Sequence, residues 1–312
     1  MVGTALEIPQ YAETYEVKCG QKKLTLTNLQ KIFWPRLHKT KRDLLIYYAA
    51  VSDVLLPHLR NRAFVIKKYP SGVEGKFVLM PKIPAYSPAW LQVCPVMRSS
   101  GNIIELPMVQ DLASLLWIVN LGCVDFCQGP VRCDDAQRPD YVHFNLDPIS
   151  PAEFPQAREA ALLIHDFFQQ KNINAYAKTT GSRGIHIYIP LYRKPCQREV
   201  WRVAKQIANT IAKRHPALLT SEHVIEKRLP GRVFIGYNQN AGGQTFSSPY
   251  SLCPSAEATA STPVTWEEIN AGVSASEFTI NSLPCRVAKI GDLFRPLVRP
   301  GTRYSLEALL SS

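Results

Sequence analysis

The sequence of 312 residues lacks any apolar stretch that approaches the roughly 18 residues of a membrane-spanning helix. Its first residues, 1–6, lack the basic start and apolar core of a signal peptide. An internal repeat and a long Gly- or Ser-rich linker are also missing. We therefore expect a cytoplasmic protein that folds as one compact α/β unit with two lobes.

The eight cysteines form no tight Cys-x-x-Cys pattern. In a cytoplasmic chain, scattered cysteines predict free thiols rather than disulfides. Cys123, Cys127 and Cys133, with His143, are the one grouping that suggests zinc. Their spacing matches no zinc knuckle, and buried apolar cysteine is common, so the metal question stays open.

Acidic residues are few relative to basic ones. The chain has 36 Lys and Arg against 25 Asp and Glu, a formal charge of +11. Such a surplus favours polyanionic partners, with nucleic acid first and an anionic membrane surface second. A basic surface without a partner is the alternative.

Residues 141–147 alternate between two sets of side chains, which predicts a strand with one buried and one polar face. Pro148 ends it, because proline cannot donate to a strand ladder. Asn145 and Asp147 lie two residues apart and so share the polar surface. Two aspartates at this spacing could hold a divalent metal, but here there is one aspartate and one amide.

The remaining pattern predicts alternating helices and strands after a polar segment, 1–23, that is loop or edge strand. Thr40 with Asp43 forms a capping-box pattern at one helix start. The expected helices are 29–35, 40–56, 111–119, 154–170, 200–213 and 266–270, with a short one at the end of the chain. The expected strands are 63–69, 77–80, 103–106, 175–179, 185–189 and 232–237.

Two further features concern anion binding. Residues 181–184 (GSRG) suggest a phosphate loop, but a strand-like run follows where such a loop must open a helix. A hairpin tip with Arg183 projecting is therefore favoured over a phosphate loop. The N-terminal third interleaves lysines with aromatic residues, which suits either DNA binding or solvated charge beside core aromatics.

Three segments resemble the motifs of a known family in order and wording: 143–148 (HFNLDP), 178–186 (KTTGSRGIH) and 233–240 (VFIGYNQN). They are similar to the polymerase domain of bacterial DNA ligase D. That domain belongs to the archaeo-eukaryotic primase-polymerase superfamily and serves non-homologous end joining. The similarity covers nearly the whole chain, from residues 24–28 to 248–251.

The resemblance implies a primase-polymerase fold of largely antiparallel central sheets flanked by helices, with two lobes around a cleft. We expect a single domain over 1–312, with 1–23 as an N-terminal extension and no ligase or nuclease segment. The resemblance implies that Asn28, Lys31 and Lys41 bind the 5′-phosphate at a DNA gap or break. It implies that the residues near an incoming nucleotide are Lys67, Thr180, Ser182, Arg183, His186 and Gln239.

The chain departs from the family at the metal site. Family members carry Asp-x-Asp in the first motif and a third Asp in the third motif, which bind two metal ions about 3.5–4 Å apart. Here Asn145 and Gly236 occupy two of these positions, and only Asp147 remains. An amide oxygen is a weaker ligand for Mg²⁺ or Mn²⁺, and glycine offers none. We expect Asp147 to hold a single ion at most.

Other departures affect nucleotide and template contacts. Cys127 stands where members usually have histidine, and Cys253 where an arginine usually helps to bind the triphosphate. Residues 77–79 replace a stretch that usually ends in two phenylalanines, one of which stacks on the template.

Two hypotheses follow. The first is a DNA-end or gap-binding protein that recognises 5′-phosphorylated breaks, with nucleotidyl transfer impaired or lost. The second is an active template-dependent polymerase that prefers ribonucleotides and uses nucleoside triphosphate with Mg²⁺ or Mn²⁺. Either would act near the nucleoid, without a membrane partner, beside a Ku-like end-binding protein and a separate DNA ligase. A basic protein unrelated to nucleic acid is the third alternative.

Overall fold

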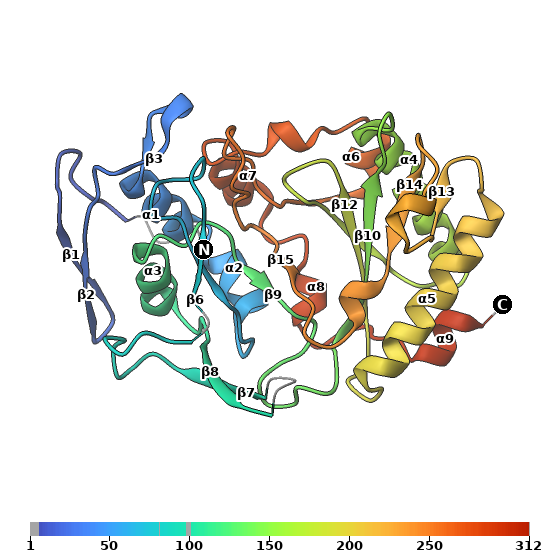
Figure 1. The fold of residues 1–312 in the computed structure, drawn as a ribbon, viewed down its shortest axis with the longest axis horizontal. Coiled ribbons are helices and arrows are strands. Elements are labelled where there is room, and N and C mark those ends of the chain that lie inside the picture. Colours follow the sequence, from blue (N-terminus) through green and yellow to red (C-terminus); the bar gives the residue numbers. More distant parts are fainter. Residues whose placement is uncertain (1–5, 81, 98–100, 312) are drawn as a thin grey trace. The chain divides into compact units, whose positions relative to one another are not determined.

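The computed structural model describes residues 6–80, 82–97 and 101–311, and its ribbon is drawn in Figure 1. The chain divides into two compact units. Unit 1 comprises Met1–Gln128, Ser247–Ala260 and Phe278–Asp292, and unit 2 comprises Gly129–Phe246, Ser261–Glu277 and Leu293–Ser312. The strand β15 (Phe246–Ser247) spans one of the points where the chain passes between them.

Unit 1 is built on helices α1 (Lys41–Ala50), α2 (Ser52–Leu59) and α3 (Leu112–Asn120), which pack against one another. Short antiparallel hairpins surround them (Figure 1). These are β1 (Tyr15–Cys19) with β2 (Lys22–Leu26), β3 (Ile32–Trp34) with β4 (Lys39–Thr40), β5 (Ile66–Lys68) with β6 (Val78–Met80), and β7 (Val93–Met97) with β8 (Ile103–Pro107). The 3₁₀ turn η1 (Pro35–Leu37), β9 (Cys127–Gln128) and α7 (Leu283–Ile290) complete it.

Helix α1 begins where the sequence predicts. Thr40 is the N-cap, and its side chain and that of Asp43 satisfy each other's backbone N–H groups in a capping box. The expected helix over 40–56 is nevertheless split at Val51, and Pro57 lies inside α2 rather than ending it.

The expected helix over 29–35 is wrong. Its apolar residues Ile32–Trp34 form β3, which pairs with β4. A short apolar run before a proline fits a strand as well as a helix, and hairpin pairing with β4, which begins at Lys39, decides between them. Within the segment 1–23, Ile8 is buried in the unit 1 core, and its carbonyl accepts hydrogen bonds from Arg42.

Unit 2 contains a six-stranded sheet in the order β13-β14-β10-β12-β11-β16. The strands are β10 (Tyr141–Pro148), β11 (Tyr176–Thr179), β12 (Ile185–Pro190), β13 (Leu219–Thr220), β14 (Val233–Gly236) and β16 (Pro263–Val264). Neighbouring strands are antiparallel except β13 and β14. The expected antiparallel sheet is therefore confirmed in unit 2, with β10 in its interior.

Helices α4 (Phe154–Gln169) and α5 (Gln197–Arg214) pack on this sheet. Phe168 of α4 lies beside Phe144 of β10, with 6.1 Å between the ring centroids. The buried positions of α5 recur every three or four residues, as expected for a helix with one face on a core. The smaller elements are η2 (Ile225–Lys227), η3 (Asn238–Asn240), α6 (Trp266–Asn270), η4 (Ala275–Glu277), α8 (Arg295–Val298) and α9 (Leu306–Leu310).

The structure confirms a mixed α/β protein with antiparallel sheets and flanking helices. Helices α4 and α6 and strand β10 lie where the sequence pattern predicts them. Among the described residues, no helix is both long and apolar enough to cross a membrane.

Candidate functional site

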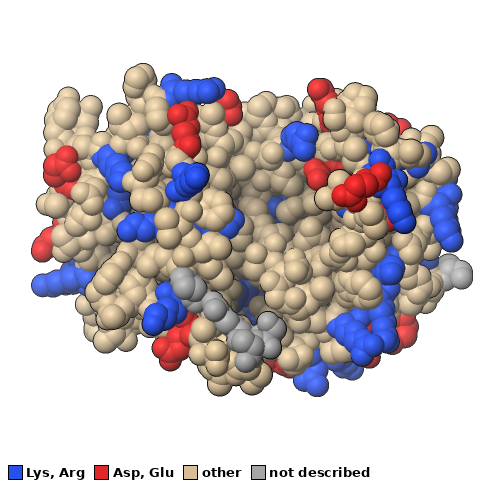
Figure 2. Space-filling view, viewed as in Figure 1, with Lys and Arg blue, Asp and Glu red and all other residues tan. Residues whose placement is uncertain are grey.

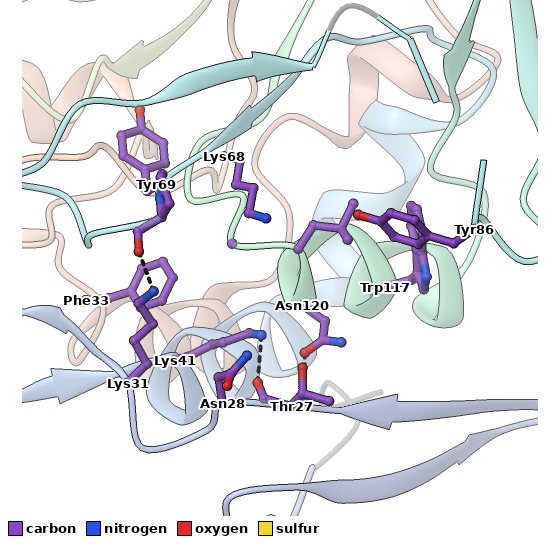
Figure 3. A pocket seen from close by; sticks show the side chains of 13 residues that line it. Thr27, Asn28, Lys31, Phe33, Lys41, Lys68, Tyr69, Tyr86, Trp117 and Asn120 are labelled. Atoms are coloured by element: carbon purple, nitrogen blue, oxygen red, sulfur yellow. Dashed lines mark hydrogen bonds between the residues drawn. The ribbon is translucent and has the colours of Figure 1, made fainter. Parts of the chain in front are cut away.

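A pocket of about 410 Å³ lies in unit 1 beside the start of α1. Figure 3 shows residues from well-separated segments approaching it. Its lining residues are Thr27, Asn28, Lys31, Phe33, Lys41, Lys68, Tyr69, Pro70, Tyr86, Trp117, Asn120, Leu121 and Gly122. These include three lysines, and none of these described lining residues is acidic. The pocket brings together all three residues that the sequence assigns to the 5′-phosphate.

Backbone contacts hold the two predicted lysines together. The Lys41 N–H donates to the Lys31 carbonyl at 2.8 Å, so the loop before β3 is fastened to the first turn of α1. The Lys41 Nζ donates to the Thr27 carbonyl at 2.7 Å, and the Lys31 Nζ donates to the Pro70 carbonyl. Asn28, which follows Thr27 in the same loop, has a positive φ of 53°, which asparagine tolerates better than most residues.

Lys41 is a buried cation, with only 4% of its surface exposed. Within the described part of the chain, no carboxylate forms an ion pair with it. Burial, together with Lys31 and Lys68, lowers the pKa of Lys41 to about 8. A buried ammonium without a counter-ion is costly, and an anion bound in the pocket would offset that cost.

The structure also decides between the two interpretations of the aromatic N-terminal third. Phe33, Trp34, Tyr47, Tyr48 and Tyr69 are buried in the core of unit 1 and cannot stack on a base. Three of the lysines, Lys31, Lys41 and Lys68, by contrast, line the pocket. The aromatic rings are therefore core residues, as one of the two interpretations predicts.

Sequence reasoning did not assign Lys68, Tyr86, Trp117 or Asn120 to this pocket. Asn120 ends α3, and its side chain accepts from the Thr27 N–H at 3.0 Å and donates to the Thr25 carbonyl at 3.1 Å. It thereby positions the loop that carries Asn28. Only the fold joins residues 27 and 120, so no local pattern could have indicated this role.

Lys67 lies in a separate cluster of unit 1. Its Nζ is 2.7 Å from Asp125 Oδ2 and 3.6 Å from Cys127 Sγ. Tyr69 donates to the other Asp125 oxygen at 2.9 Å. Burial opposes the charge of Lys67, but Cys127 and Asp125 together raise its pKa. Burial raises the pKa of the Cys127 thiol to about 12, so this residue is a neutral thiol at physiological pH.

In unit 2 the sheet register aligns the predicted catalytic positions. Asn145 pairs with Gly236 on β14 and with His186 on β12, and Asp147 pairs with Phe234. Asn145 and Asp147 are partly exposed, in a strand whose other residues are buried. The three positions that would carry carboxylates thus lie on two neighbouring strands, as the resemblance implies.

The position of Gly236 is crowded. A Cβ placed there would lie 3.1 Å from Phe234 Cε1 and 3.3 Å from Asn145 Cβ. The Arg228 guanidinium carbon sits 3.6 Å from the centroid of the Phe234 ring. An aromatic ring under an arginine therefore packs against the place of the third carboxylate.

These residues do not fit a pair of divalent metal ions. Asp147 supplies one carboxylate, Asn145 a neutral amide, and Gly236 no ligand. In the described ranges, no three His, Cys, Asp or Glu side chains lie close enough to hold a metal, and this includes the Cys123 and Cys127 region. The arrangement lacks the negative charge on which two-metal catalysis depends.

Other carboxylates do not replace the missing ones. Asp125 is tied to Lys67, Asp134 to Arg193 at 2.9 Å, and Asp135 to Arg138 at 2.9 Å. Each of these ion pairs lies within one unit. The sequence gives no indication that any of these three carboxylates takes part in the metal site, and their ion pairs agree with that.

The turn at 181–184 closes on itself. The Thr180 side chain accepts from the N–H groups of Ser182 and Gly184, both at 3.2 Å, and the Thr180 N–H donates to the Gly184 carbonyl at 3.0 Å. These amides are therefore not free to cradle a phosphate. The turn joins β11 to β12 and leaves Ser182 and Arg183 exposed, which confirms a hairpin tip.

The expected polar face of β10 is only partly polar. His143 is fully buried and stacks on Phe246 with 4.2 Å between ring centroids, and Tyr141 is also buried. Burial, with a smaller effect of Lys178, holds the pKa of His143 and of His186 well below the usual range. Both imidazoles are neutral and belong to an aromatic cluster. The alternating pattern therefore predicts a solvent-facing polar side chain correctly only at Asn145 and Asp147.

Two further predictions from the sequence concern Gln239 and the cysteines. Gln239 lies in η3 with a buried side-chain oxygen that has no partner among the described residues. Cys19, Cys123, Cys127, Cys196, Cys253 and Cys285 are free thiols as expected. The expectation is wrong for Cys94 and Cys133, which are disulfide-bonded.

Comparison with known proteins agrees with this fold. A family model described as LigD, primase-polymerase domain, matches residues 40–294. The bifunctional non-homologous end joining protein LigD of Bacillus subtilis is 31% identical over 92% of this chain and 46% of its own length. The multifunctional non-homologous end joining protein LigD of Mycobacterium bovis is 28% identical over 89% of this chain and 37% of its own length.

A solved structure is similar over almost its entire length. The polymerase domain of Mycobacterium tuberculosis ligase D in complex with DNA matches with a TM-score of 0.83 and 27% identity, covering 89% of this chain and 99% of that one. The chain therefore belongs to the LigD primase-polymerase domain family of non-homologous end joining repair proteins. It spans less than half the length of the curated relatives described above.

Proposed function

We propose that this protein binds double-stranded DNA at ends, gaps or overhangs and recognises the 5′-phosphate through Asn28, Lys31 and Lys41. The observation that carries the proposal is the pocket of unit 1, where Lys41 is buried without a carboxylate partner in the described chain. A 5′-phosphate would supply the missing anion, and charge-assisted hydrogen bonds to phosphate are the strong ones. The solved relative bound to DNA supports a nucleic-acid ligand.

We further propose that nucleotidyl transfer is impaired or lost. The family's chemistry depends on metal ions, Mg²⁺ or Mn²⁺, that stabilise the attacking and leaving oxygens. The donor set of Asn145, Asp147 and Gly236 does not fit two such ions. Lys67, Thr180, Ser182, Arg183, His186 and Gln239 remain as candidates for contact with a nucleoside triphosphate, without the carboxylates to complete the site.

The cellular role follows from the relatives. The names of these relatives include non-homologous end joining. We propose that this protein serves the same repair near the nucleoid, as an end-bridging or docking component beside a Ku-like protein and a DNA ligase activity. A retained DNA pocket without a complete metal site suits this role better than gap filling.

A binding experiment tests the pocket. Fluorescent gapped duplexes carrying either a 5′-phosphate or a 5′-hydroxyl are titrated with the wild-type protein, Lys31→Ala, Lys41→Ala and the control Lys18→Ala on exposed β1. A lost charge-assisted hydrogen bond costs about 1.5–3 kcal/mol, so each pocket variant should bind 5′-phosphorylated DNA roughly tenfold to a hundredfold more weakly. The control should match the wild type.

The ratio of the affinity for the 5′-phosphate duplex to the affinity for the 5′-hydroxyl duplex decides the test. We expect it to exceed about tenfold in the wild type and to approach one in both pocket variants. Equal binding of the two duplexes by the wild-type protein would contradict the assignment of the pocket. Because Lys31 is exposed, its variant tests the proposal even if Lys41→Ala lowers the stability of α1.

A further inference from the structure

The outer face of α5 in unit 2 is strongly basic. Five of its side chains are cationic and one, Glu199 in the first turn, is acidic. Arg198, Arg202, Lys205 and Lys213 recur at intervals of three to eight residues and form one stripe with Asn209. The Glu199 carboxylate accepts a hydrogen bond from the Cys196 N–H at 2.7 Å and so caps the start of α5.

This charge is specific to α5. The other long helix of the unit, α4, mixes Arg158 with Glu159 and Asp166 and carries no such stripe. Like charges three or four residues apart destabilise a helix by about 0.2–0.5 kcal/mol per pair, so the stripe works against the stability of α5. Figure 2 shows Lys and Arg side chains gathered over this region, at the right of the view.

The stripe borders two hollows in the surface. One, of about 340 Å³, is lined by Arg202, Lys205, Gln206, Asn209, Thr210 and Lys213. The other, of about 460 Å³, shares Lys205, Asn209 and Lys213 with the first and extends beyond α5 to Ser221, His223, Arg232 and Tyr237. The shared residues make the two hollows one groove, and every part of it lies in unit 2.

Cations outnumber carboxylates among the described residues that line this groove. Within the described ranges, no carboxylate forms an ion pair with Arg202, Lys205, Lys213 or Arg232. Glu222, which lines one end of the groove, accepts a hydrogen bond from the Val224 N–H at 2.9 Å. The groove therefore has four cationic side chains, Arg202, Lys205, Lys213 and Arg232, against one lining carboxylate, Glu222, together with amide and hydroxyl groups.

We propose that the α5 groove, defined by Arg202, Lys205, Asn209, Lys213 and Arg232, binds the sugar-phosphate backbone of duplex DNA without requiring an end. Arg202 and Lys213 lie eleven residues apart, about 16 Å along the helix axis. One DNA strand advances about 3.4 Å per phosphate, so the stripe matches a run of about five phosphates. This site goes beyond the terminal 5′-phosphate pocket of the proposed function.

The lining of the groove favours DNA over other anionic partners. No large apolar side chain of α5 is exposed, so the helix has nothing to insert into a lipid surface. Protein interfaces are depleted in lysine at their centres, whereas this groove has two lysines there. Gln206, Asn209 and Thr210 add neutral donors of the kind that position a DNA backbone.

The test uses a covalently closed duplex circle, which has no end or gap. The triple variant Arg202→Ala/Lys205→Ala/Lys213→Ala is compared with Lys18→Ala/Lys23→Ala/Lys289→Ala, which removes the same charge from exposed sites elsewhere. The slope of log affinity against log salt should fall by about three in the α5 variant and by less than about one in the control. At about 0.1 M salt the α5 variant should bind the circle roughly tenfold or more weakly.

Lysine acetylation of the wild-type protein provides a measurement that needs no variant. Bound closed circle should protect Lys205 and Lys213 several-fold from labelling and leave Lys18 and Lys289 unchanged. The α5 variant should keep its preference for 5′-phosphate, whereas Lys31→Ala/Lys41→Ala should lose that preference and keep its salt slope on the circle. The proposal for the α5 groove and the proposal for the 5′-phosphate pocket can therefore be refuted independently of each other.

Two results would overturn the α5 proposal. One is unchanged binding of the closed circle by the α5 variant, with no protection of Lys205 or Lys213 in the wild type. The other is an α5 variant that loses binding to phosphatidylglycerol vesicles while its binding to the closed circle matches the wild type. That result would assign the groove to a lipid surface.

Discussion

The pocket of unit 1 and the strand centre of unit 2, where β10 pairs with β14, differ in the charged groups that they contain. In the pocket, Lys31 and Lys41 are held by backbone contacts and have no acidic neighbour among the lining residues. At the strand centre, Asp147 alone remains of three carboxylate positions, and Phe234 packs against the position of Gly236. The pocket contains three lysines, whereas the strand centre contains a single carboxylate.

The pairing of the strands at the strand centre does not depend on which side chains the centre offers. The register of β10 against β12 and β14 depends on backbone hydrogen bonds and on the buried side chains of the sheet, and neither requires a carboxylate. Metal binding depends on the side chains alone. The proposed function therefore treats binding of DNA and transfer of a nucleotide as separate properties of this chain.

The largest expected effect comes from restoring the strand centre. Asn145→Asp/Gly236→Asp returns the three carboxylates, and adding Phe234→Val removes the ring that crowds position 236. Two metal ions supply several kcal/mol of transition-state stabilisation, so primer extension on gapped DNA with Mn²⁺ should rise about a hundredfold or more. The wild-type protein should give no product above a reaction without enzyme.

The control for this prediction is Asp147→Ala, alone and in the restored variant. It should abolish the restored activity and leave binding to 5′-phosphorylated DNA within about twofold of the wild type. Extension by the wild-type protein that disappears in Asp147→Ala would show instead that the altered centre is active. The comparison of the two regions would then no longer hold.

The second prediction concerns the backbone that the strand centre retains. A Cβ at Gly184 would lie 2.6 Å from the Leu146 carbonyl, so Gly184→Ala must move β12 away from β10. Overpacking of this kind costs about 2 kcal/mol, and unit 2 should unfold at a lower urea concentration. Gly301→Ala is the matched control, because a Cβ there meets no atom within 4 Å. Equal midpoints for both variants would show that the contact is easily relieved.

The third and smallest effect is the pH dependence of the pocket. The pKa of Lys41 is lowered to about 8, so the free protein loses this charge as pH rises through about 8. A bound phosphate favours the protonated amine, and binding of the 5′-phosphate should therefore weaken about tenfold between about pH 7 and about pH 9. Titration of gapped duplexes with 5′-phosphate measures this change.

The 5′-hydroxyl duplex is the control for the pH series, since it lacks the group that Lys41 contacts. Its affinity should change less than about twofold over the same range. A parallel decline for both duplexes would mean that the pH effect arises outside the pocket. Such a result would weaken the contrast between a pocket lined by lysines and a strand centre with a single carboxylate.

Much of the secondary structure was predictable because it depends on local chemistry. The capping box of Thr40 and Asp43 starts α1, and the spacing of apolar residues predicts α4. The failures have a common cause. Residues 32–34 form a strand because β4 pairs with them, and His143 is buried because Phe246 covers it. Neither partner is visible in the local pattern.

The sequence by itself determined which ligands the strand centre can offer, since an amide and a glycine lack carboxylate oxygens wherever they lie. It also determined where most helices and strands begin, because caps and periodicity act over a few residues. Only the tertiary structure decided that Lys41 is buried beside Lys31, with Asn120 positioning their loop. It alone joined α5 to Arg232 in one groove, because burial and electrostatic environment depend on residues far apart in the chain.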